Sequence, residues 1–123
     1  GQKFVGRGPA RRSYAPLVAG KFIAARSAFD EIPNDPAFCD LAALAGIDAD
    51  GASRERLEAL AGGALSQGAW LVLFAHEVGA AARQTLAAES LDGFCRYLTS
   101  CDGRIWVGTV AEVASCIIGQ RKA

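Results

Sequence analysis

Apolar residues form continuous runs in some segments of the chain and recur three and four positions apart in others. The two patterns predict strands that alternate with helices. Residues 70–75 (WLVLFA) are continuously apolar and are bounded by Gly68 and His76. This pattern is typical of a strand that is buried on both faces of a parallel sheet. Residues 105–109 (IWVGT) form a second, shorter run of this type, and a third begins with residues 22–25 (FIAA). We therefore expect strands at these three places.

Apolar residues three and four positions apart predict helices in other segments. We expect helices over residues 54–66, 88–99 and 110–118, and a short helix over residues 14–20 with Pro16 in its first turn. Strands that alternate with helices predict an α/β fold, in which parallel strands are joined by right-handed crossovers.

Polar and turn-forming segments separate these elements. Residues 1–13 are rich in Gly and Arg and predict a loop, as do residues 31–36 and 76–85. Residues 41–48 (LAALAGID) are apolar but too short to distinguish a buried strand from a short helix. Ser53 is the expected N-cap of the helix that follows, without the Glu or Gln three residues later that a capping box needs.

Length and composition limit the classes of protein to consider. The chain has 123 residues, of which 51% are hydrophobic, which suffices for a single unit with a buried core. The 13 basic and 13 acidic residues give a net charge of zero, which argues against a nucleic-acid partner. No apolar run approaches the roughly 20 residues of a membrane span, and no basic-then-apolar opening suggests a signal peptide. A cytoplasmic and an exported location both stay open.

The four cysteines do not have the spacing of a metal or redox motif. No pair of them is separated by two residues, so neither a zinc ribbon nor a thioredoxin-like motif is supported. In a chain this apolar we expect buried or half-buried free thiols on amphipathic elements. The residues concerned are Cys39, Cys95, Cys101 and Cys116.

Candidate chemistry gathers where the predicted strands end, because sites in parallel α/β folds form beyond the carboxyl ends of the strands. His76 is the one histidine of the chain and directly follows the run WLVLFA. Asp48 and Asp50 follow the apolar residues 41–48, and Arg26 lies near the end of the segment FIAA. A strand-end hydrogen bond for the histidine, turn chemistry for the aspartates and plain exposure for the arginine remain alternative interpretations.

Several common motifs are excluded. A zinc-protease motif would need a second histidine at position 80, which is Ala80. The chain lacks the G-x-S-x-G elbow of serine hydrolases. Gly6 and Gly8 do not begin a dinucleotide-binding loop, because Arg11 stands where the third glycine would be.

The sequence resembles the C-terminal part of polysaccharide deacetylases, the hydrolases of NodB homology. The stretch from residue 70 to residue 117 carries most of the resemblance, in the segments WLVLFAHEVG, RQT (83–85), LDGFCRYL (91–98) and IWVGTVAEVASCI (105–117). Weaker matches precede it in AAR (24–26), NDP (34–36), DL (40–41) and GIDAD (46–50). Gly1 and Gln2 resemble the last two letters of an F-A-Y-P-C-G-Q motif found in a bacterial branch of the family.

The resemblance implies a fold, an activity and roles for particular residues. The fold would be the C-terminal part of a distorted (β/α) barrel, and the activity would be hydrolysis of acetyl groups from carbohydrates. His76 matches the family's general acid, and Asp48 or Asp50 lies where the family has an acidic motif that supports the base. The resemblance also implies substrate-binding roles for Phe74, at a position where many members have Leu in the acetyl pocket, and for Thr85.

Arg26 is the remaining candidate for substrate binding, at the rim of the same site. Family members hold a divalent metal ion, often Zn²⁺, with an Asp and two His from motifs that would precede Gly1. We therefore expect no metal site within these 123 residues and no activity from them alone. We also expect self-association through exposed strand edges. A non-catalytic carbohydrate-binding or assembly domain and a thiol-redox protein are the alternative functions.

Overall fold

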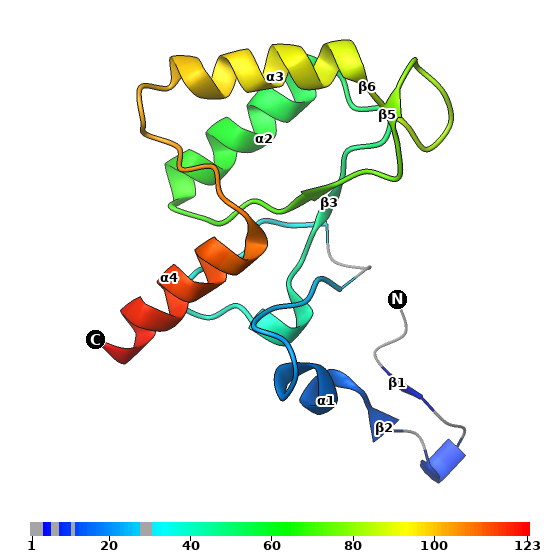
Figure 1. Ribbon diagram of the computed structural model, residues 1–123, viewed down its shortest axis with the longest axis vertical. Coiled ribbons are helices and arrows are strands. Elements are labelled where there is room, and N and C mark those ends of the chain that lie inside the picture. The colour runs from blue at the N-terminus through cyan, green and yellow to red at the C-terminus, as the bar shows by residue number, and fades with distance from the viewer. Residues whose placement is uncertain (1–3, 6–7, 11, 28–30) are drawn as a thin grey trace.

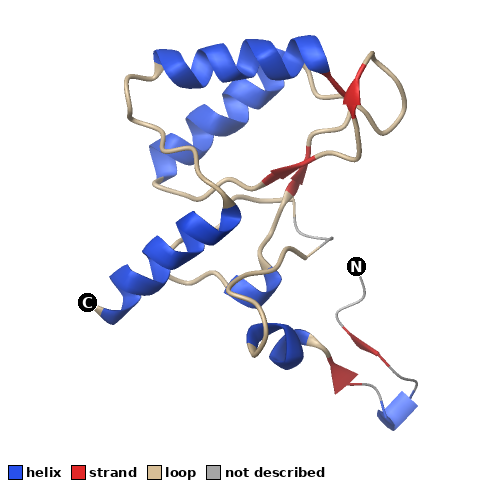
Figure 2. Ribbon diagram, viewed as in Figure 1, coloured by secondary structure: helices blue, strands red, loops and turns tan. Residues whose placement is uncertain are grey.

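The computed structural model describes residues 4–5, 8–10, 12–27 and 31–123, which contain both helices and short strands (Figures 1 and 2). The α-helices are α1 (Ala15–Ala19), α2 (Arg54–Gln67), α3 (Ala88–Ser100) and α4 (Val110–Lys122). The strands are β1 (Phe4–Val5), β2 (Arg12–Ser13), β3 (Ile47–Asp48), β4 (Leu73–Phe74), β5 (Val78–Gly79) and β6 (Leu86–Ala87). The two types alternate only in part, because β4, β5 and β6 follow one another without a helix between them. Two 3-10 helices cover Gly8–Ala10 and Leu41–Ala43.

Three extended segments lie next to one another and run parallel: the one around Arg26, the one from Leu44 to Asp48, and β4. Strands β3 and β4 pair in parallel, with Ile47 opposite Leu73 and Asp48 opposite Phe74. A single parallel bridge between Arg26 and Leu44 places an earlier segment on the other side of β3. Strands β5 and β6 form a second parallel pair. This content is compatible with the predicted α/β fold, and the described strands do not form a closed barrel.

The core lies between the β3–β4 pair and the helices α2 and α3, which run next to each other (Figure 1). Leu57 and Ala61 of α2 meet Phe94 of α3 there, and all three are less than 10% exposed. Leu73 of β4 packs against the same cluster. Because side chains of a strand alternate between its faces, the next residue, Phe74, points away from these helices.

The helix ends follow local chemistry that the sequence predicts in part. The Ser53 side chain accepts a hydrogen bond from the backbone N–H of Arg56 and is the N-cap of α2, as predicted. Gly68 ends α2 in the left-handed conformation, with φ of 61°, which glycine adopts without strain. Thr109 and Glu112 form a full capping box at the start of α4, which the sequence analysis does not anticipate.

Two of the three predicted strands are wrong. Among the described residues, 22–25 and 105–109 belong to no strand. Among the described residues, 105–109 form no ladder or bridge with another segment, and Thr109 uses its backbone N–H in the capping box. Within residues 70–75 only Leu73–Phe74 joins a ladder, because Trp70 instead forms an antiparallel bridge with Asn34.

The predicted helices are confirmed, and the predicted loops are correct only in part. The helices expected over 54–66, 88–99, 110–118 and 14–20 are confirmed with small changes of boundary. Residues 41–48 contain both alternatives, a 3-10 helix and then β3. The loop expected over 1–13 is wrong in part, since β1 pairs with β2 in an antiparallel register. The loop expected over 76–85 likewise contains β5, and Gly1, Gln2 and Gly6 lie outside the described residues.

The cysteine prediction is half correct. Cys101 is buried and Cys39 is half-buried, both as free thiols. Cys95 and Cys116 are exposed free thiols, contrary to the prediction. Cys95 lies one residue beyond Phe94, and one residue rotates a helical position by about a quarter turn, which carries Cys95 off the buried face of α3.

Candidate functional site

The carboxyl ends of the three parallel segments bring five sequence-predicted residues to one place. Arg26 lies beside β3 through its bridge to Leu44, Asp48 ends β3 and Phe74 ends β4. Parallel segments end at a common edge, so the side chains that follow them meet there. Asp50 and His76, two residues beyond Asp48 and Phe74, complete the group.

His76 is held by Asp50 at two points. The Nδ1 atom of the imidazole lies 2.6 Å from Oδ2 of Asp50. The backbone N–H of His76 donates to the other carboxylate oxygen, Oδ1, at 3.1 Å. An ionised carboxylate only accepts hydrogen bonds, so Nδ1 carries the proton and Nε2 is the ring nitrogen left for other partners. The His76 side chain is 54% exposed and that of Asp50 is 11% exposed, so the pair opens to solvent on the histidine side.

Asp48 orients the turn that carries Asp50. Its Oδ1 atom accepts the backbone N–H of Asp50 at 2.9 Å, an Asx turn of the kind that aspartate favours. Gly51 follows with a φ of 65°, a conformation that costs glycine little. The turn thereby directs the Asp50 carboxylate toward the end of β4.

An arginine and a phenylalanine form the wall beside the histidine. The guanidinium carbon of Arg26 lies 3.8 Å from the centroid of the Phe74 ring, a cation–π arrangement. The Phe74 ring meets the His76 ring edge to face, with centroids 6.3 Å apart and an interplanar angle of 72°. Arg26 also donates from Nη1 to the carbonyl oxygen of Ser27 at 3.0 Å. These contacts orient the guanidinium over the Phe74 ring.

Thr85 contributes to this region through its backbone. It is 3% exposed, and its carbonyl oxygen accepts the N–H of Gly51 at 3.0 Å. Its hydroxyl donates to the carbonyl oxygen of Arg83 at 3.3 Å. Thr85 thus connects the loop after His76 to the turn after Asp50. Its hydroxyl is used within that loop, by the carbonyl oxygen two residues earlier.

Two residues that matter to this geometry are missed by the sequence analysis. Asn34 is 5% exposed and joins the beginnings of the parallel segments: its side chain accepts from the N–H of Ala45 and donates to the Ala45 carbonyl, each at 2.9 Å. It also exchanges backbone hydrogen bonds with Trp70. Gly46 lies under Arg26 and Phe74. An asparagine before Asp-Pro indicates a turn, and a glycine indicates a flexible position. The sequence therefore carries no signal that separates Asn34 and Gly46 from ordinary turn or loop residues.

The cluster of Asp48, Asp50 and His76 is small enough to hold a cation, since one ligand atom from each residue lies within 4.8 Å of the others. It is not the set of one Asp and two His that the resemblance implies, because the chain has one histidine. The Asp50 carboxylate is also committed to His76, so a cation would compete with the imidazole for it. The residues therefore do not fit the family's metal.

A cavity of about 530 Å³ lies on the opposite face of β4 from this site. It is bounded by the three long helices, by β4 with the residues before it and by the segment before α4, and its lining includes Leu65, Leu73, Phe94, Trp106 and Ile117. None of the six candidate site residues lines it. The cavity is therefore separate from the Asp50–His76 pair.

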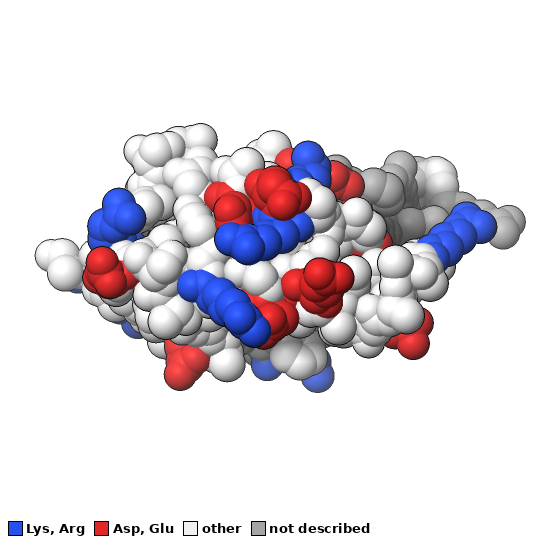
Figure 3. Space-filling view, turned by 90° about the horizontal axis from the view of Figure 1, so that it is seen from above, with Lys and Arg blue, Asp and Glu red and all other residues white. Residues whose placement is uncertain are grey.

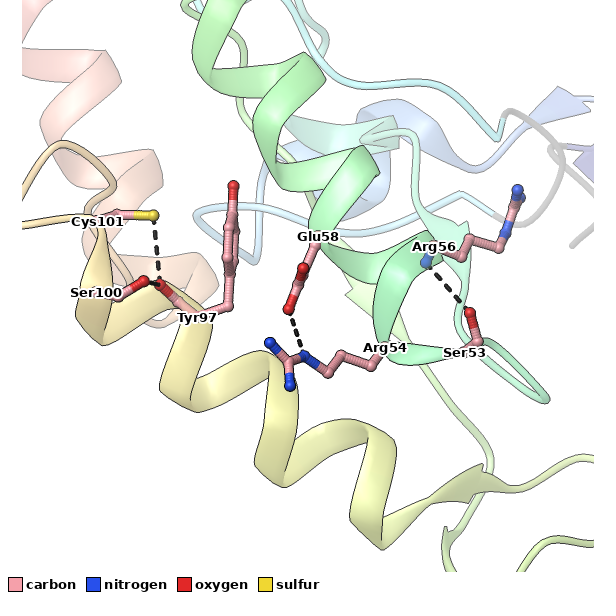
Figure 4. A network of polar contacts seen from close by, with 7 residues as sticks. All are labelled: Ser53, Arg54, Arg56, Glu58, Tyr97, Ser100 and Cys101. Carbon is pink, nitrogen blue, oxygen red and sulfur yellow. Dashed lines mark hydrogen bonds and ion pairs between the residues drawn. The ribbon is translucent and has the colours of Figure 1, made fainter.

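Polar contacts within α2 and within α3 also lie apart from the candidate site residues (Figure 4). Arg54 pairs with Glu58 within α2, and the Tyr97 carbonyl accepts from Ser100 Oγ at 2.7 Å and from Cys101 Sγ at 3.4 Å. Loss of hydration against the core, with the nearby Cys101 thiol, raises the pKa of the Tyr97 hydroxyl. The face seen in Figure 3 carries acidic and basic side chains next to one another. The ion pairs Arg54–Glu58 and Asp92–Arg96 each join residues of a single helix.

Comparison of the chain with protein-family models, with curated proteins and with solved structures found no match. Among the described residues, no helix has both the length and the hydropathy required to cross a membrane.

Proposed function

We propose that this chain is the C-terminal portion of a metal-dependent carbohydrate deacetylase, in which His76 is the general acid. The observation that carries the proposal is the Asp50–His76 pair, with 2.6 Å between carboxylate oxygen and Nδ1, at the carboxyl ends of parallel segments. The resemblance of residues 70–117 to this family supports the same assignment from the sequence.

The pair has the parts that a proton donor needs. Asp50 fixes the ring and stabilises the imidazolium by accepting its Nδ1–H, as carboxylates do for catalytic histidines. The Nε2–H of the imidazolium then gives its proton to the leaving nitrogen of the acetamido group as the C–N bond breaks. The electron pair of that bond goes to nitrogen, and His76 is left neutral with its proton on Nδ1. A histidine with 54% of its side chain exposed is open to a sugar-bound group.

The wall of Arg26 and Phe74 supplies a position for the acyl group. The aromatic ring presents an apolar surface beside the imidazole, and an acetyl methyl group is apolar. The guanidinium on the other side of that ring lies at the rim, where it can hydrogen-bond sugar hydroxyls or an anionic group. Asp48 supports the Asp50–His76 pair because it stabilises the turn that carries Asp50. The Thr85 carbonyl accepts a hydrogen bond from the next residue of that turn, Gly51.

These residues cannot supply the ligands that the family uses for its metal ion. One histidine cannot supply an Asp-His-His set, so the proposal assigns to this chain the proton transfer and the binding of the acyl group. Activation of water by a divalent ion would need ligands from other residues. We expect that the 123 residues alone release no acetate, and that their exposed strand edges cause self-association, measurable by light scattering.

The coding DNA upstream of Gly1 gives the first test. The proposal expects, in the same reading frame, an Asp-Asp motif and a His-x-x-x-His motif. A frame that lacks both motifs contradicts it and favours a non-catalytic carbohydrate-binding or assembly domain.

Acetate release gives the second test. The protein encoded by the whole frame, with its metal, is assayed on N-acetylated oligosaccharides. His76→Gln is expected to lower kcat by about 10²–10⁴-fold, the usual contribution of a general acid, with a smaller change in KM. Glu77→Gln, a substitution of the neighbouring exposed residue, is the matched control. An unchanged kcat in His76→Gln would show that another group donates the proton.

A further inference from the structure

One buried glycine, Gly46, lies against both members of the Arg26–Phe74 wall. Gly46 is buried just before β3. A Cβ atom built on Gly46 would lie 2.6 Å from Cδ of Arg26 and 3.1 Å from its Cγ. The same atom would lie 3.3 Å from Cδ1 of Phe74. Carbon atoms in proteins pack at about 3.5–4.0 Å, so any side chain at this position collides first with the arginine.

We propose that Gly46 is a positioning residue that sets the wall beside His76 by giving the Arg26 side chain its path across Phe74. The methylene groups of Arg26 occupy the space that a Cβ would fill, and this path ends with the guanidinium 3.8 Å from the ring centroid. The ring that this cation covers is the one that meets the His76 ring in a T-shaped arrangement. The order of contacts is therefore Gly46 to Arg26, Arg26 to Phe74 and Phe74 to His76.

The steric conflict falls on a part of the molecule that can move. Arg26 is exposed, and its described hydrogen bond is to the carbonyl oxygen of Ser27. A methyl group at position 46 can be accommodated by swinging the arginine out to solvent, while the backbone pairing of β3 remains. Gly46→Ala is thus expected to fold and to lose the stack, which separates a positioning role from a role in folding.

The consequence for substrate rests on the proposed function. If the wall faces the acyl group, Gly46 and Arg26 together limit that group to a small one such as acetyl, because a displaced arginine frees Phe74 to rotate. The positioning itself can be measured without any substrate, so its failure and the failure of the deacetylase proposal are distinguishable.

The first measurement is the ring-current shift of Arg26 in the 123-residue chain. The side-chain protons of an arginine above an aromatic ring resonate upfield of their free position. We expect this shift in the wild type and its loss in Gly46→Ala and in Phe74→Leu. Gly63→Ala is the matched control, because a Cβ at Gly63 meets nothing within 4 Å. Retention of the Arg26 shift in Gly46→Ala would overturn the proposal.

The second measurement reports on His76, and a purely structural role would leave it unchanged. Diethylpyrocarbonate modifies imidazoles, and the chain has a single histidine, so the absorbance change reports one group. We expect Gly46→Ala and Arg26→Ala each to raise the modification rate, and the double variant to raise it no further than Arg26→Ala alone.

An additive effect in the double variant would overturn the route through arginine and show that Gly46 acts on Phe74 directly. If Gly46→Ala does not fold, Arg26→Ala decides. A raised modification rate in Arg26→Ala, together with loss of the Arg26 upfield shift in Phe74→Leu, supports the wall, and an unchanged rate in Arg26→Ala overturns it.

Discussion

His76 Nδ1 lies 2.6 Å from Oδ2 of Asp50, a residue 26 positions earlier, and the backbone N–H of His76 bonds to the second oxygen of the same carboxylate. One side chain thereby fixes both the chain direction after β4 and the orientation of the imidazole ring. The parallel pairing of β3 with β4 makes this possible, because it brings the ends of the two strands to the same edge.

Asp50→Ala is expected to change the tautomer of the neutral His76 ring. The hydrogen bond of one ring nitrogen determines which nitrogen carries the proton. In the wild type the proton lies on Nδ1, and without the carboxylate it shifts toward Nε2. Long-range ¹H–¹⁵N spectra of the single histidine distinguish the two forms.

The same substitution is expected to lower the free energy of unfolding by about 1–3 kcal/mol, since hydrogen bonds to a carboxylate 11% exposed are lost. Asp92→Ala, at an exposed pair with Arg96, is the control and should change stability by less than about 0.5 kcal/mol. An Nδ1–H tautomer that persists in Asp50→Ala would show that the carboxylate does not orient the ring.

Asn34→Ala is expected to be one of the more destabilising single substitutions in the chain. It removes three side-chain hydrogen bonds and leaves the buried N–H and carbonyl of Ala45 without them. Each unsatisfied buried group costs about 1–3 kcal/mol, so a loss of about 2–4 kcal/mol is expected in urea unfolding. Asp35→Ala is the matched control, because that side chain accepts a single exposed N–H.

Asn34→Asp tests the same clamp by chemistry. A carboxylate can still accept from the Ala45 N–H but cannot donate to the Ala45 carbonyl. It should therefore be destabilising although the side chain keeps its size. Equal stability of Asn34→Asp and the wild type would contradict the clamp.

Hydrophobic periodicity predicted the helices well, because the spacing of apolar residues in a helix reports which face is buried. The buried face of α3 carries Phe94 as expected. The position of His76 after an apolar run also located it correctly at the end of a strand. The meeting of Asp48, Asp50 and His76 followed from one further premise, that the strands are parallel.

Strand pairing itself was not predictable from apolar runs. A continuous apolar run such as residues 105–109 indicates that its side chains pack against the rest of the protein. Whether its backbone pairs in a sheet depends on a second strand elsewhere in the chain, which the run itself does not reveal. Trp106 and Val107 are in fact 58% and 67% exposed. The same limit applies to Trp70, whose partner is Asn34 on a segment that reads as a turn.

The capping box of α4 is expected to give the protein a pH dependence in the acidic range. Glu112 accepts hydrogen bonds from the backbone N–H and the hydroxyl of Thr109 at 2.7 and 2.8 Å. The backbone bond first and the hydroxyl second lower the pKa of Glu112 below its ordinary value. A carboxyl whose folded pKa is lowered stabilises the fold above its unfolded pKa and loses that contribution as the pH falls through the folded pKa.

Glu112→Gln is the variant that tests this linkage. The free energies of unfolding of wild type and variant should differ at neutral pH and converge as the pH falls below the ordinary carboxyl range. Glu77→Gln serves as control, since the Glu77 side chain has no hydrogen bond among the described residues. A difference between Glu112→Gln and the wild type that stays constant from neutral to acidic pH would contradict the linkage.

Gly63 inside α2 and Gly68 at its C-terminal end should respond in opposite directions to the same substitution. Gly63 lies inside the helix, and a Cβ there meets nothing within 4 Å. Gly63→Ala should raise the free energy of unfolding by about 0.5–1 kcal/mol, because alanine loses less backbone entropy on folding. Gly68 ends the helix with a φ of 61°, where a Cβ costs about 1–2 kcal/mol, so Gly68→Ala should lower it. Because both variants add one methyl group, urea unfolding of the pair isolates backbone conformation, and a change of the same sign in both would contradict the left-handed end of α2.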